Sequence, residues 1–349
     1  QILAYLIMSI KLNVFCMRVR RIDMKMNDKE VLIKVKGITK WFPVKRSFFE
    51  EQQYVKAVDD VSFTLNKGET MGIVGESGCG KSTLARTLLR LIEPTKGEIE
   101  YKGQSILGKK QKELSPIRKD MQIIFQDPYN SLHPRMKIGD IIAEPLIISR
   151  VMPNKHERDE RIKELIKMVG LDESYLERYP HELSGGQRQR IVIARALATN
   201  PELVICDEPV SALDVSVRAQ ILNLLEELQE KLNLTYIFIS HDLSVVEHIC
   251  DSVCIMYLGQ IIESGMTKDI FENPIHPYTE ALMSAIPVVG KRTNEGRIIL
   301  EGDIPSPVNP PSGCRFRTRC RYARPQCEEK PIMQEVGKKH FVACHRLNW

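Results

Sequence analysis

One glycine-rich stretch constrains the fold of this chain more than any other. Residues 75–82 read GESGCGKS and fit the phosphate-binding pattern G-x-x-x-x-G-K-[ST]. The apolar run Met71–Val74 before it predicts a short buried strand, and leucines at 84, 88 and 91 recur after it at helical spacing. A strand, a glycine-rich loop and a helix in this order turn backbone N–H groups toward one point, at the positive end of the helix dipole. The stretch therefore predicts a nucleotide site.

The residue types in this loop suit a polyphosphate bound with magnesium. Its glycines allow a tight backbone path in which a Cβ would be strained. Lys81 can reach the β- and γ-phosphates, and the Ser82 hydroxyl can ligate Mg²⁺. The predicted nucleotide-binding residues of the loop are Gly75, Glu76, Ser77, Gly78, Cys79, Gly80, Lys81, Ser82 and Thr83.

Strand and helix patterns alternate along much of the chain. Apolar or alternating runs predict strands at 31–35, 61–65, 121–125, 203–206, 236–239, 253–258 and 260–263. Residues 127–200 lack a strand pattern, and helices are predicted at 139–148, at 157–170 and, further on, at 215–232. We therefore expect an α/β fold with a largely parallel sheet and a helical insert.

Composition excludes the membrane-embedded and secreted classes. The chain is 43% hydrophobic and 27% charged with a net charge of +5, as in an ordinary globular protein with a solvated surface. Its longest uncharged run, at the N-terminus, ends at Lys11 and is too short for a membrane span. No basic region precedes this run and no small-residue cleavage site follows it, so a secretory signal is not expected. We expect residues 1–26 to be non-native sequence or a flexible tail, with the natural start near Met24 or Met26.

Two adjacent carboxylates follow one of the predicted buried strands. Asp207 and Glu208 come directly after the apolar residues 203–206, at the carboxyl end of the strand, where α/β folds bind ligands. Asp207 suits a magnesium shell, and Glu208 suits the polarisation of an attacking water. Taken alone, this pair is a weak signal.

A second motif, together with the first, makes the chain resemble a known protein family. Residues 183–187 read LSGGQ. With the phosphate loop, Gln126, Asp207–Glu208 and His241 in this order, the chain resembles the ATP-binding subunit of ABC transporters, from about Val31 to its C-terminus. The resemblance implies a P-loop NTPase core, bound ATP and Mg²⁺, and ATP hydrolysis.

The resemblance also implies how two copies of such a subunit share their sites. In a head-to-tail dimer, the motif residues Ser184, Gly185, Gly186 and Gln187 would bind the γ-phosphate held by the opposite subunit. Asp214 would lie between the two sites. The opening of a helix at residues 184–186 is consistent with this role, since its N–H groups would face the phosphate.

Within one subunit, the resemblance assigns a role to each remaining candidate. Glu208, His241 and Gln126 form the catalytic set. Glu208 would polarise the water, His241 would contact the γ-phosphate, and Gln126 would sense the water and Mg²⁺. The residues expected to hold Mg²⁺ are Ser82, Gln126 and Asp207. Phe42 fits the adenine-stacking position better than its neighbour Trp41.

Three further stretches resemble the oligopeptide and dipeptide importers. They are residues 126–136 (QDPYNSLHPRM), 276–282 (HPYTEAL) and 304–307 (IPSP). The resemblance implies that ATP hydrolysis energises import of di- or oligopeptides. An importer of nickel or another small solute shares most of these motifs, because selectivity lies in other subunits. A soluble ABC ATPase acting on nucleic acid or ribosomes is less favoured, because such proteins typically carry two cassettes or a coiled-coil insert.

The same resemblance implies partners and a location. The chain would pair with a second ABC ATPase subunit, identical or different, and with two membrane permease subunits. An extracytoplasmic peptide-binding protein would act with them indirectly, and no nucleic acid is expected. The chain would therefore be peripheral, on the cytoplasmic face of the cell membrane.

Four cysteines crowd the end of the chain, at Cys314, Cys320, Cys327 and Cys344. Disulfides do not suit a reducing compartment, and the closely spaced pairs usual for zinc are absent. Iron–sulfur clusters tolerate wider spacing, and some peptide-importer subunits carry a [4Fe–4S] cluster here. A cluster is thus the favoured cofactor, with Zn²⁺ or four unliganded thiols as alternatives. We expect an ATPase domain at 27–270, with its helical subdomain at about 127–200, and a four-cysteine domain at 271–349.

Overall fold

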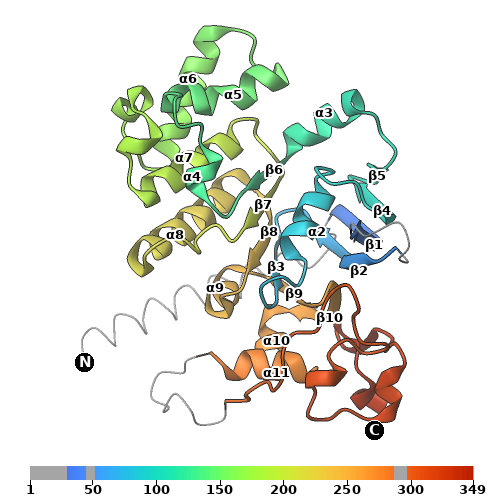
Figure 1. The fold of residues 1–349 in the computed structure, drawn as a ribbon. Helices are drawn as coiled ribbons and strands as arrows, with labels where there is room; N and C mark the ends of the chain where they lie inside the picture. The colour runs from blue at the N-terminus through green and yellow to red at the C-terminus, as the bar shows by residue number, and fades with distance from the viewer. Residues whose placement is uncertain (1–29, 45–51, 287–296, 349) are drawn as a thin grey trace, which may run out of the picture.

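The computed structural model describes residues 30–44, 52–286 and 297–348 (Figure 1). The prediction for residues 1–26 lies outside these ranges. Helices and strands alternate through most of the described chain, and parallel pairing predominates in the main sheet. The α/β expectation is therefore confirmed.

The main sheet has eight strands in the order β11-β12-β10-β9-β3-β8-β7-β6. The five strands from β9 to β6 run parallel, whereas β10, β12 and β11 are added antiparallel at one edge. The bounds are β3 Thr70–Val74, β6 Met121–Ile124, β7 Leu203–Asp207, β8 Thr235–Ser240, β9 Ser252–Tyr257, β10 Gln260–Met266, β11 Gln334–Gly337 and β12 His340–Val342.

The central strands are continuous apolar runs because both faces of the sheet are covered. Every residue of β3, β7 and β8 is buried. Successive side chains point to opposite faces, so Ile205 and Ile237 belong to one hydrophobic core while Cys206 and Phe238 belong to the other. Burial on both faces explains why these strands could be recognised from the sequence.

A smaller antiparallel sheet packs against one face of the main sheet. Its order is β2-β1-β4-β5, and it shares a hydrophobic core with the helix α2 that follows the phosphate loop. The bounds are β1 Val31–Pro43, β2 Tyr54–Asn66, β4 Lys96–Tyr101, β5 Gln104–Ser105 and α2 Lys81–Leu88. The prediction that Leu91 continues the helix after the phosphate loop is wrong. Leu91 is 51% exposed, because α2 ends at Leu88 and Arg90 adopts a left-handed φ of 50°.

A group of helices is inserted between β6 and β7, and Figure 1 shows it set apart from the sheet. Residues 127–200, all within the described ranges, contain no strand, as predicted. The bounds are α4 Pro128–Ser131, α5 Ile138–Ser149, α6 Lys155–Met168, η1 Glu173–Glu177, η2 Pro180–Glu182 and α7 Gly185–Leu197. The side chain of Asn154 caps α6, and Gly170 leaves the helix with φ 72°.

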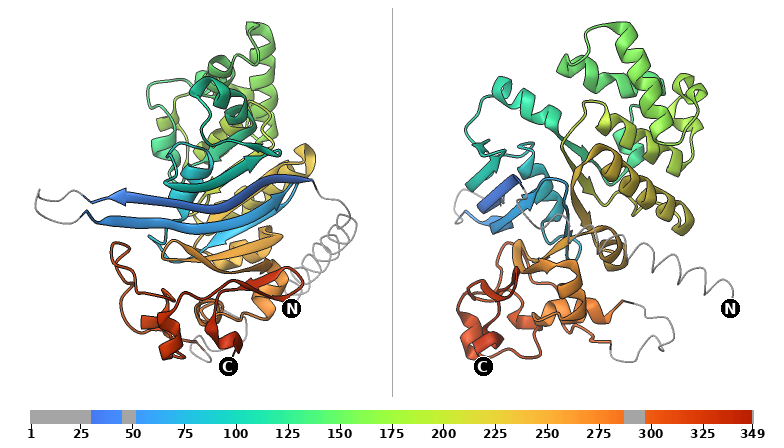
Figure 2. Two further views of the ribbon diagram at one scale, coloured as in Figure 1. Left: turned by 90° about the vertical axis from the view of Figure 1, so that its right-hand side faces the viewer. Right: turned by 180° about the vertical axis from the view of Figure 1, so that it is seen from behind.

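The remaining helices flank the sheet, and the C-terminal part packs below it (Figure 2). They are α3 Gln111–Asp120, α8 Val215–Leu232, α9 Leu243–Ile249, α10 Thr267–Glu272 and α11 Pro277–Ser284. The C-terminal part adds three short 3-10 helices, η3 Arg317–Arg319, η4 Pro325–Glu328 and η5 His345–Asn348. Since β12 pairs with β10, this part extends the main sheet rather than forming a separate one. No helix in the described ranges is long and apolar enough to cross a bilayer.

Candidate nucleotide site and four-cysteine cavity

A cavity of about 580 Å³ lies beside the phosphate loop, at the carboxyl ends of the parallel strands. Most of the predicted site residues line it: Phe42, Ser77, Gly78, Cys79, Gly80, Lys81, Ser82, Thr83, Gln126, Glu208 and His241. Trp41 is not among the lining residues, and its indole nitrogen donates to Asp59 instead. The structure thus places Phe42, and not Trp41, at the nucleotide cavity.

The phosphate loop has the tight path that its glycines predict. A Cβ on Gly75 would lie 2.1 Å from the carbonyl oxygen of Met256, and one on Gly80 would lie 1.9 Å from that of Ala57. Gly80 also has φ 107°, in the left-handed region. Lys81 is 5% exposed and donates to the carbonyl oxygens of Gly75, at 2.8 Å, and Glu76, at 3.0 Å. The loop is therefore closed around its lysine and permits no side chain at Gly75 or Gly80.

Two of the predicted catalytic residues contact the third, Glu208. The amide nitrogen of Gln126 donates to Glu208 Oε2 at 2.9 Å, and His241 Nδ1 lies 3.1 Å from the same oxygen. Glu208 itself has a left-handed φ of 50°, an uncommon conformation for a residue with a Cβ. Such a conformation persists only where the surroundings impose it, as they do at many functional sites. Residues that follow the carboxyl ends of β6, β7 and β8 are thereby brought together at one carboxylate beside the cavity.

The oxygen donors expected for magnesium also converge. Ser82 Oγ donates to Asp207 Oδ1 at 2.9 Å, so the hydroxyl at the start of α2 and the carboxylate at the end of β7 are side by side. Asp207 is 2% exposed, and burial raises the pKa of its carboxyl. A divalent cation would offset this burial, and a hydroxyl with a carboxylate is the hard donor set that Mg²⁺ takes. Gln126 is bonded to Glu208 rather than to this pair.

The LSGGQ segment lies outside the nucleotide cavity of its own chain. Ser184 caps α7 by accepting from the Gln187 N–H at 3.3 Å, and Gln187 Oε1 accepts from the Ser184 N–H at 2.9 Å. This reciprocal cap places Gly185 and Gly186 in the first turn of the helix. A Cβ on Gly186 would lie 2.5 Å from Val217, which places the segment beside the start of α8, where Asp214 is the exposed N-cap residue.

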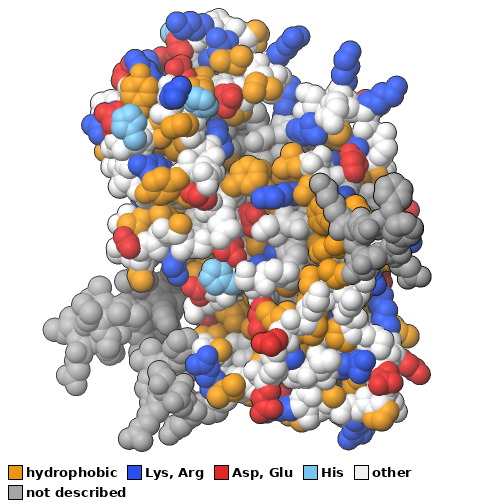
Figure 3. Space-filling view, in the orientation of Figure 1, with side chains coloured by type: hydrophobic (Ala, Val, Ile, Leu, Met, Phe, Trp, Pro, Cys, Tyr) orange, Lys and Arg blue, Asp and Glu red, His pale blue; other side chains and the backbone are white. Residues whose placement is uncertain are grey.

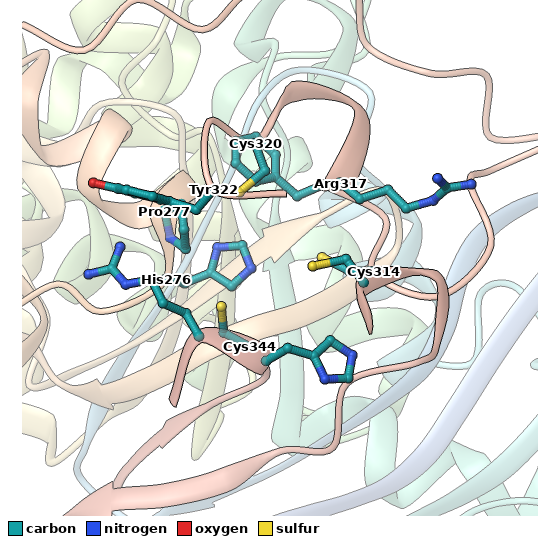
Figure 4. A pocket seen from close by; sticks show the side chains of 11 residues that line it. His276, Pro277, Cys314, Arg317, Cys320, Tyr322 and Cys344 are labelled. Carbon is teal, nitrogen blue, oxygen red and sulfur yellow. The ribbon is translucent and has the colours of Figure 1, made fainter. Parts of the chain in front are cut away.

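The four C-terminal cysteines line one small cavity, together with His276 (Figure 4). None of them is in a disulfide. Burial raises the pKa of the Cys314 thiol to about 12 and also raises the pKa values of Cys320 and Cys344. The four cysteines, which are widely spaced in the sequence, therefore come together at one cavity. Within the described residues, no group of three or more His, Cys, Asp or Glu side chains is arranged to hold a metal ion.

His276 gives this cavity an unpartnered donor. It is 1% exposed, and its Nδ1 accepts from the Tyr278 N–H at 3.1 Å, which leaves the proton on Nε2. Nε2 is buried and has no hydrogen-bond partner in the described structure. In Figure 4 the side chain lies between Cys320 and Cys344. Burial lowers the pKa of His276 to about 3, so the ring is neutral. Cysteine thiols can ligate a metal ion or an iron–sulfur cluster once deprotonated, and a buried N–H can donate to a sulfur bound there.

Two features of the site had no signal in the sequence. Pro307, in the IPSP stretch, lines the nucleotide cavity, and its carbonyl oxygen accepts from the Lys56 N–H at 3.0 Å. Gly259 lines the same cavity and donates to the carbonyl oxygen of Cys79 at 2.8 Å. The IPSP stretch supported a family resemblance, but the sequence did not predict that this stretch lies at the nucleotide cavity. Both contacts join segments far apart along the chain.

The fold and the cavity together define an ABC-type ATPase. A family described as ABC transporter matches residues 58–211, and one described as oligopeptide/dipeptide transporter, C-terminal region, matches residues 262–327. The ATP-binding cassette MJ0796, solved as a dimer in a post-hydrolysis state with ADP and Pi, superposes with a TM-score of 0.60 at 32% identity, covering 68% of this chain and 99% of that one.

Curated relatives extend the match to nearly the whole chain. The oligopeptide transport ATP-binding protein AppF of Bacillus subtilis is 54% identical over 323 residues, covering 91% of this chain and 98% of its own. The oligopeptide transport ATP-binding protein OppF of Escherichia coli is 48% identical over 331 residues, covering 94% and 97%. The chain belongs to the family of ATP-binding subunits of oligopeptide and dipeptide ABC transporters.

Proposed function

We propose that this chain hydrolyses ATP to energise import of di- and oligopeptides through a membrane ABC transporter. The convergence of Gln126, Glu208 and His241 beside the phosphate-loop cavity carries the ATPase part of the proposal. The solute class rests on the family and on the relatives named for peptide transport. Two permease subunits, an extracytoplasmic peptide-binding protein and a position on the cytoplasmic face of the membrane follow from the same relationship.

In the proposed reaction, each residue of the site acts where it lies. Glu208 accepts a hydrogen bond from the attacking water and polarises it, while Gln126 holds the carboxylate and His241 contacts the γ-phosphate. Lys81 and the loop N–H groups neutralise the phosphates. Bound Mg²⁺, held at Ser82 and Asp207, would supply charge on the β- and γ-oxygens. Phe42 would stack on adenine.

The LSGGQ segment acts in trans in this proposal. Since Ser184, Gly186 and Gln187 lie outside their own cavity, they are available to a γ-phosphate on a second ATPase subunit. ATP binding would close the pair, and hydrolysis with product release would reopen it. Asp214, at the N-cap of α8 beside this segment, would lie at the same interface.

Transport in vesicles tests the function. The chain, its genetically linked permeases and the partner ATPase are reconstituted in lipid vesicles with the linked binding protein, and ATP-driven uptake of a labelled di- or oligopeptide is measured. Uptake that needs ATP and is lost with Glu208→Gln is the expected result. Uptake of Ni²⁺ with exclusion of peptides would move the chain to the small-solute branch.

The nucleic-acid alternative receives little support from the face of the molecule that Figure 3 shows. On the face shown in Figure 3, basic and acidic side chains are interspersed, without the basic stripe that a nucleic-acid groove presents. Stimulation of the ATPase by RNA or ribosomes, with none by the permeases, would favour that alternative.

For the four cysteines we propose a [4Fe–4S] cluster with Zn²⁺ as the competing occupant. Support comes from four thiols at one cavity and from the unpaired Nε2–H of His276. Anaerobic purification with iron, sulfide and zinc analysis and a visible spectrum tests this. Colourless, iron-free protein would exclude the cluster.

A further inference from the structure

The segment that carries the cysteines also contacts the phosphate loop directly. Arg319, the residue before Cys320, places its guanidinium against the carboxylate of Glu76, with Nη1 2.8 Å from Oε2 and Nη2 3.2 Å from Oε1. The Arg319 side chain is 7% exposed and that of Glu76 is 27% exposed. Two parallel, charge-assisted bonds fix the geometry of both partners more tightly than a single bond does.

The backbone of Glu76 is held from the same side. Its N–H donates to Tyr278 Oη at 2.9 Å, and Tyr278 is fully buried at the start of α11. The Tyr278 ring lies 5.4 Å from that of Phe316 and 4.8 Å from that of Tyr257, measured between centroids. Phe316 lies between the first two of the four cysteines, and Tyr257 ends β9. One residue of the phosphate loop is therefore held, by main chain and side chain, from the C-terminal part.

The charge of Glu76 makes this contact matter for nucleotide binding. The loop binds a polyanion, and a carboxylate inside it opposes the field of its lysine and N–H groups. Arg319 cancels that negative charge in a partly buried place, where screening by water is weak. It also restrains the residue that directly follows Gly75, where a Cβ would lie 2.1 Å from the carbonyl oxygen of Met256.

We propose that Arg319 is a positioning residue for the phosphate loop: it neutralises and orients Glu76 so that the loop receives the ATP phosphates. Arg319 lies 243 residues from Glu76 along the chain, outside the segment 58–211 that matches the ABC transporter family. The proposal rests on the ATPase activity alone. It does not depend on the transported solute or on what the cysteines bind.

The test separates neutralisation of charge from simple anchoring of the C-terminal segment. Purified full-length variants are titrated with a fluorescent ATP analogue at fixed salt, and steady-state hydrolysis is measured in parallel. Arg319→Gln is expected to weaken nucleotide binding about tenfold and to raise KM accordingly, with kcat changed less than threefold, since ground and transition states lose the same support. Arg319→Lys, which retains the charge without the fork, is expected to be intermediate.

The double variant Glu76→Gln/Arg319→Gln decides between the two roles. If Arg319 acts on the charge of Glu76, removal of the carboxylate restores most of the lost affinity. If Arg319 only anchors the segment, the double variant stays as weak as Arg319→Gln, and the proposal is overturned. It is also overturned if Arg319→Gln binds nucleotide normally.

Arg321 provides a matched control two residues along the same segment. It is 51% exposed and its Nη2 lies 3.2 Å from Glu280 on α11, away from the loop. Arg321→Gln is expected to leave nucleotide affinity and KM unchanged. Should Arg319→Gln fail to fold, the comparison between Arg319→Lys and Arg321→Lys, scored by nucleotide affinity, keeps the same two outcomes: weaker binding only at position 319 supports the proposal, and equal binding overturns it.

Discussion

At the scale of single residues, the site depends on two neighbouring carboxylates with different surroundings. Glu208 has two polar partners and borders the cavity, whereas Asp207 is buried with Ser82 as its hydrogen-bond partner. One suits the handling of water, and the other suits a cation. A difference in environment thus assigns two roles to residues that are adjacent in sequence and chemically alike.

Glu208→Gln tests the first role. The amide keeps the size of the side chain but cannot accept a proton from water, so hydrolysis should fall by about 10²-fold or more while ATP binding is retained. The variant should accumulate as an ATP-bound dimer. Phosphate release and nucleotide binding measure the two effects, and Glu272→Gln on the exposed end of α10 is the control. Near-normal turnover would remove Glu208 from its proposed role.

Asp207→Asn tests the second role, and we expect it to raise the melting temperature while it lowers the affinity for Mg²⁺. Burial raises the pKa of Asp207, so the ionised carboxylate is less favourable in the folded chain than in the unfolded one and lowers the stability of the fold. This cost begins to fall as the pH drops through the raised pKa of the folded state, and it is gone below the ordinary carboxyl pKa of the unfolded chain. The variant should therefore melt at a higher temperature than the parent at pH 7 without Mg²⁺, and at a similar one in acid. Its Mg²⁺ affinity should fall by about 10- to 100-fold. A lower melting temperature at pH 7 would contradict this account.

At the scale of secondary-structure elements, the sequence predicted the strands and helices whose hydrophobic pattern is set by burial. The strands β3, β7 and β8 are apolar throughout because both faces are covered, and α8 shows a periodic buried stripe between its caps. The short polar strand β5 and the 3-10 helices around the cysteines bury few residues, so they leave no periodicity to read. Leu91 fits the helical spacing but falls after the turn that ends α2.

Asn154 offers a prediction about one of the inserted helices. Its side chain accepts from the His156 N–H at 2.9 Å and caps α6, whose buried residues include Leu165 and Ile166. Asn154→Ala should lower the free energy of unfolding by about 1 kcal/mol, because one helical N–H loses its partner. Asn154→Asp, which keeps the cap, is the control. Chemical denaturation measures the change, and ATPase turnover at 25 °C should be unaffected. Equal loss in both variants would show that the cap is not the cause.

At the scale of the molecule, the site is assembled from segments that no local pattern connects. The resemblance of the motifs anticipated that Gln126, Glu208 and His241 belong together. It could not anticipate the contacts that the C-terminal part makes with the nucleotide site, at Pro307 and Arg319. Arg315 adds a third: its buried guanidinium donates to the carbonyl oxygen of Leu258 and to Asp59. Such pairs join residues more than fifty positions apart, and their partners are decided by tertiary packing.

The organisation of the whole molecule also predicts how two ATPase subunits share their nucleotide sites. One chain carries one phosphate loop and one LSGGQ segment, and the two do not share a cavity. In a head-to-tail dimer, Lys81→Ala spoils the site built on its own loop, while Ser184→Arg spoils the site built on the partner's loop. A dimer of either variant alone therefore has two damaged sites. A mixed dimer has both defects in one site and leaves the other intact.

Mixing the two variants should therefore restore activity. Each variant alone should hydrolyse ATP at less than about a hundredth of the parent rate, because the γ-phosphate loses a charged or backbone partner at every site. Ser184→Arg should still bind ATP with parental affinity, since its own loop is unchanged. An equimolar mixture should recover about a quarter of the parent rate, given that half the dimers are mixed and each has one working site. Turnover is measured against dimer formation by light scattering. A mixture that forms dimers and stays inactive would refute sites shared between subunits, whereas full activity of parent chains diluted until they are monomeric would refute the need for a second subunit.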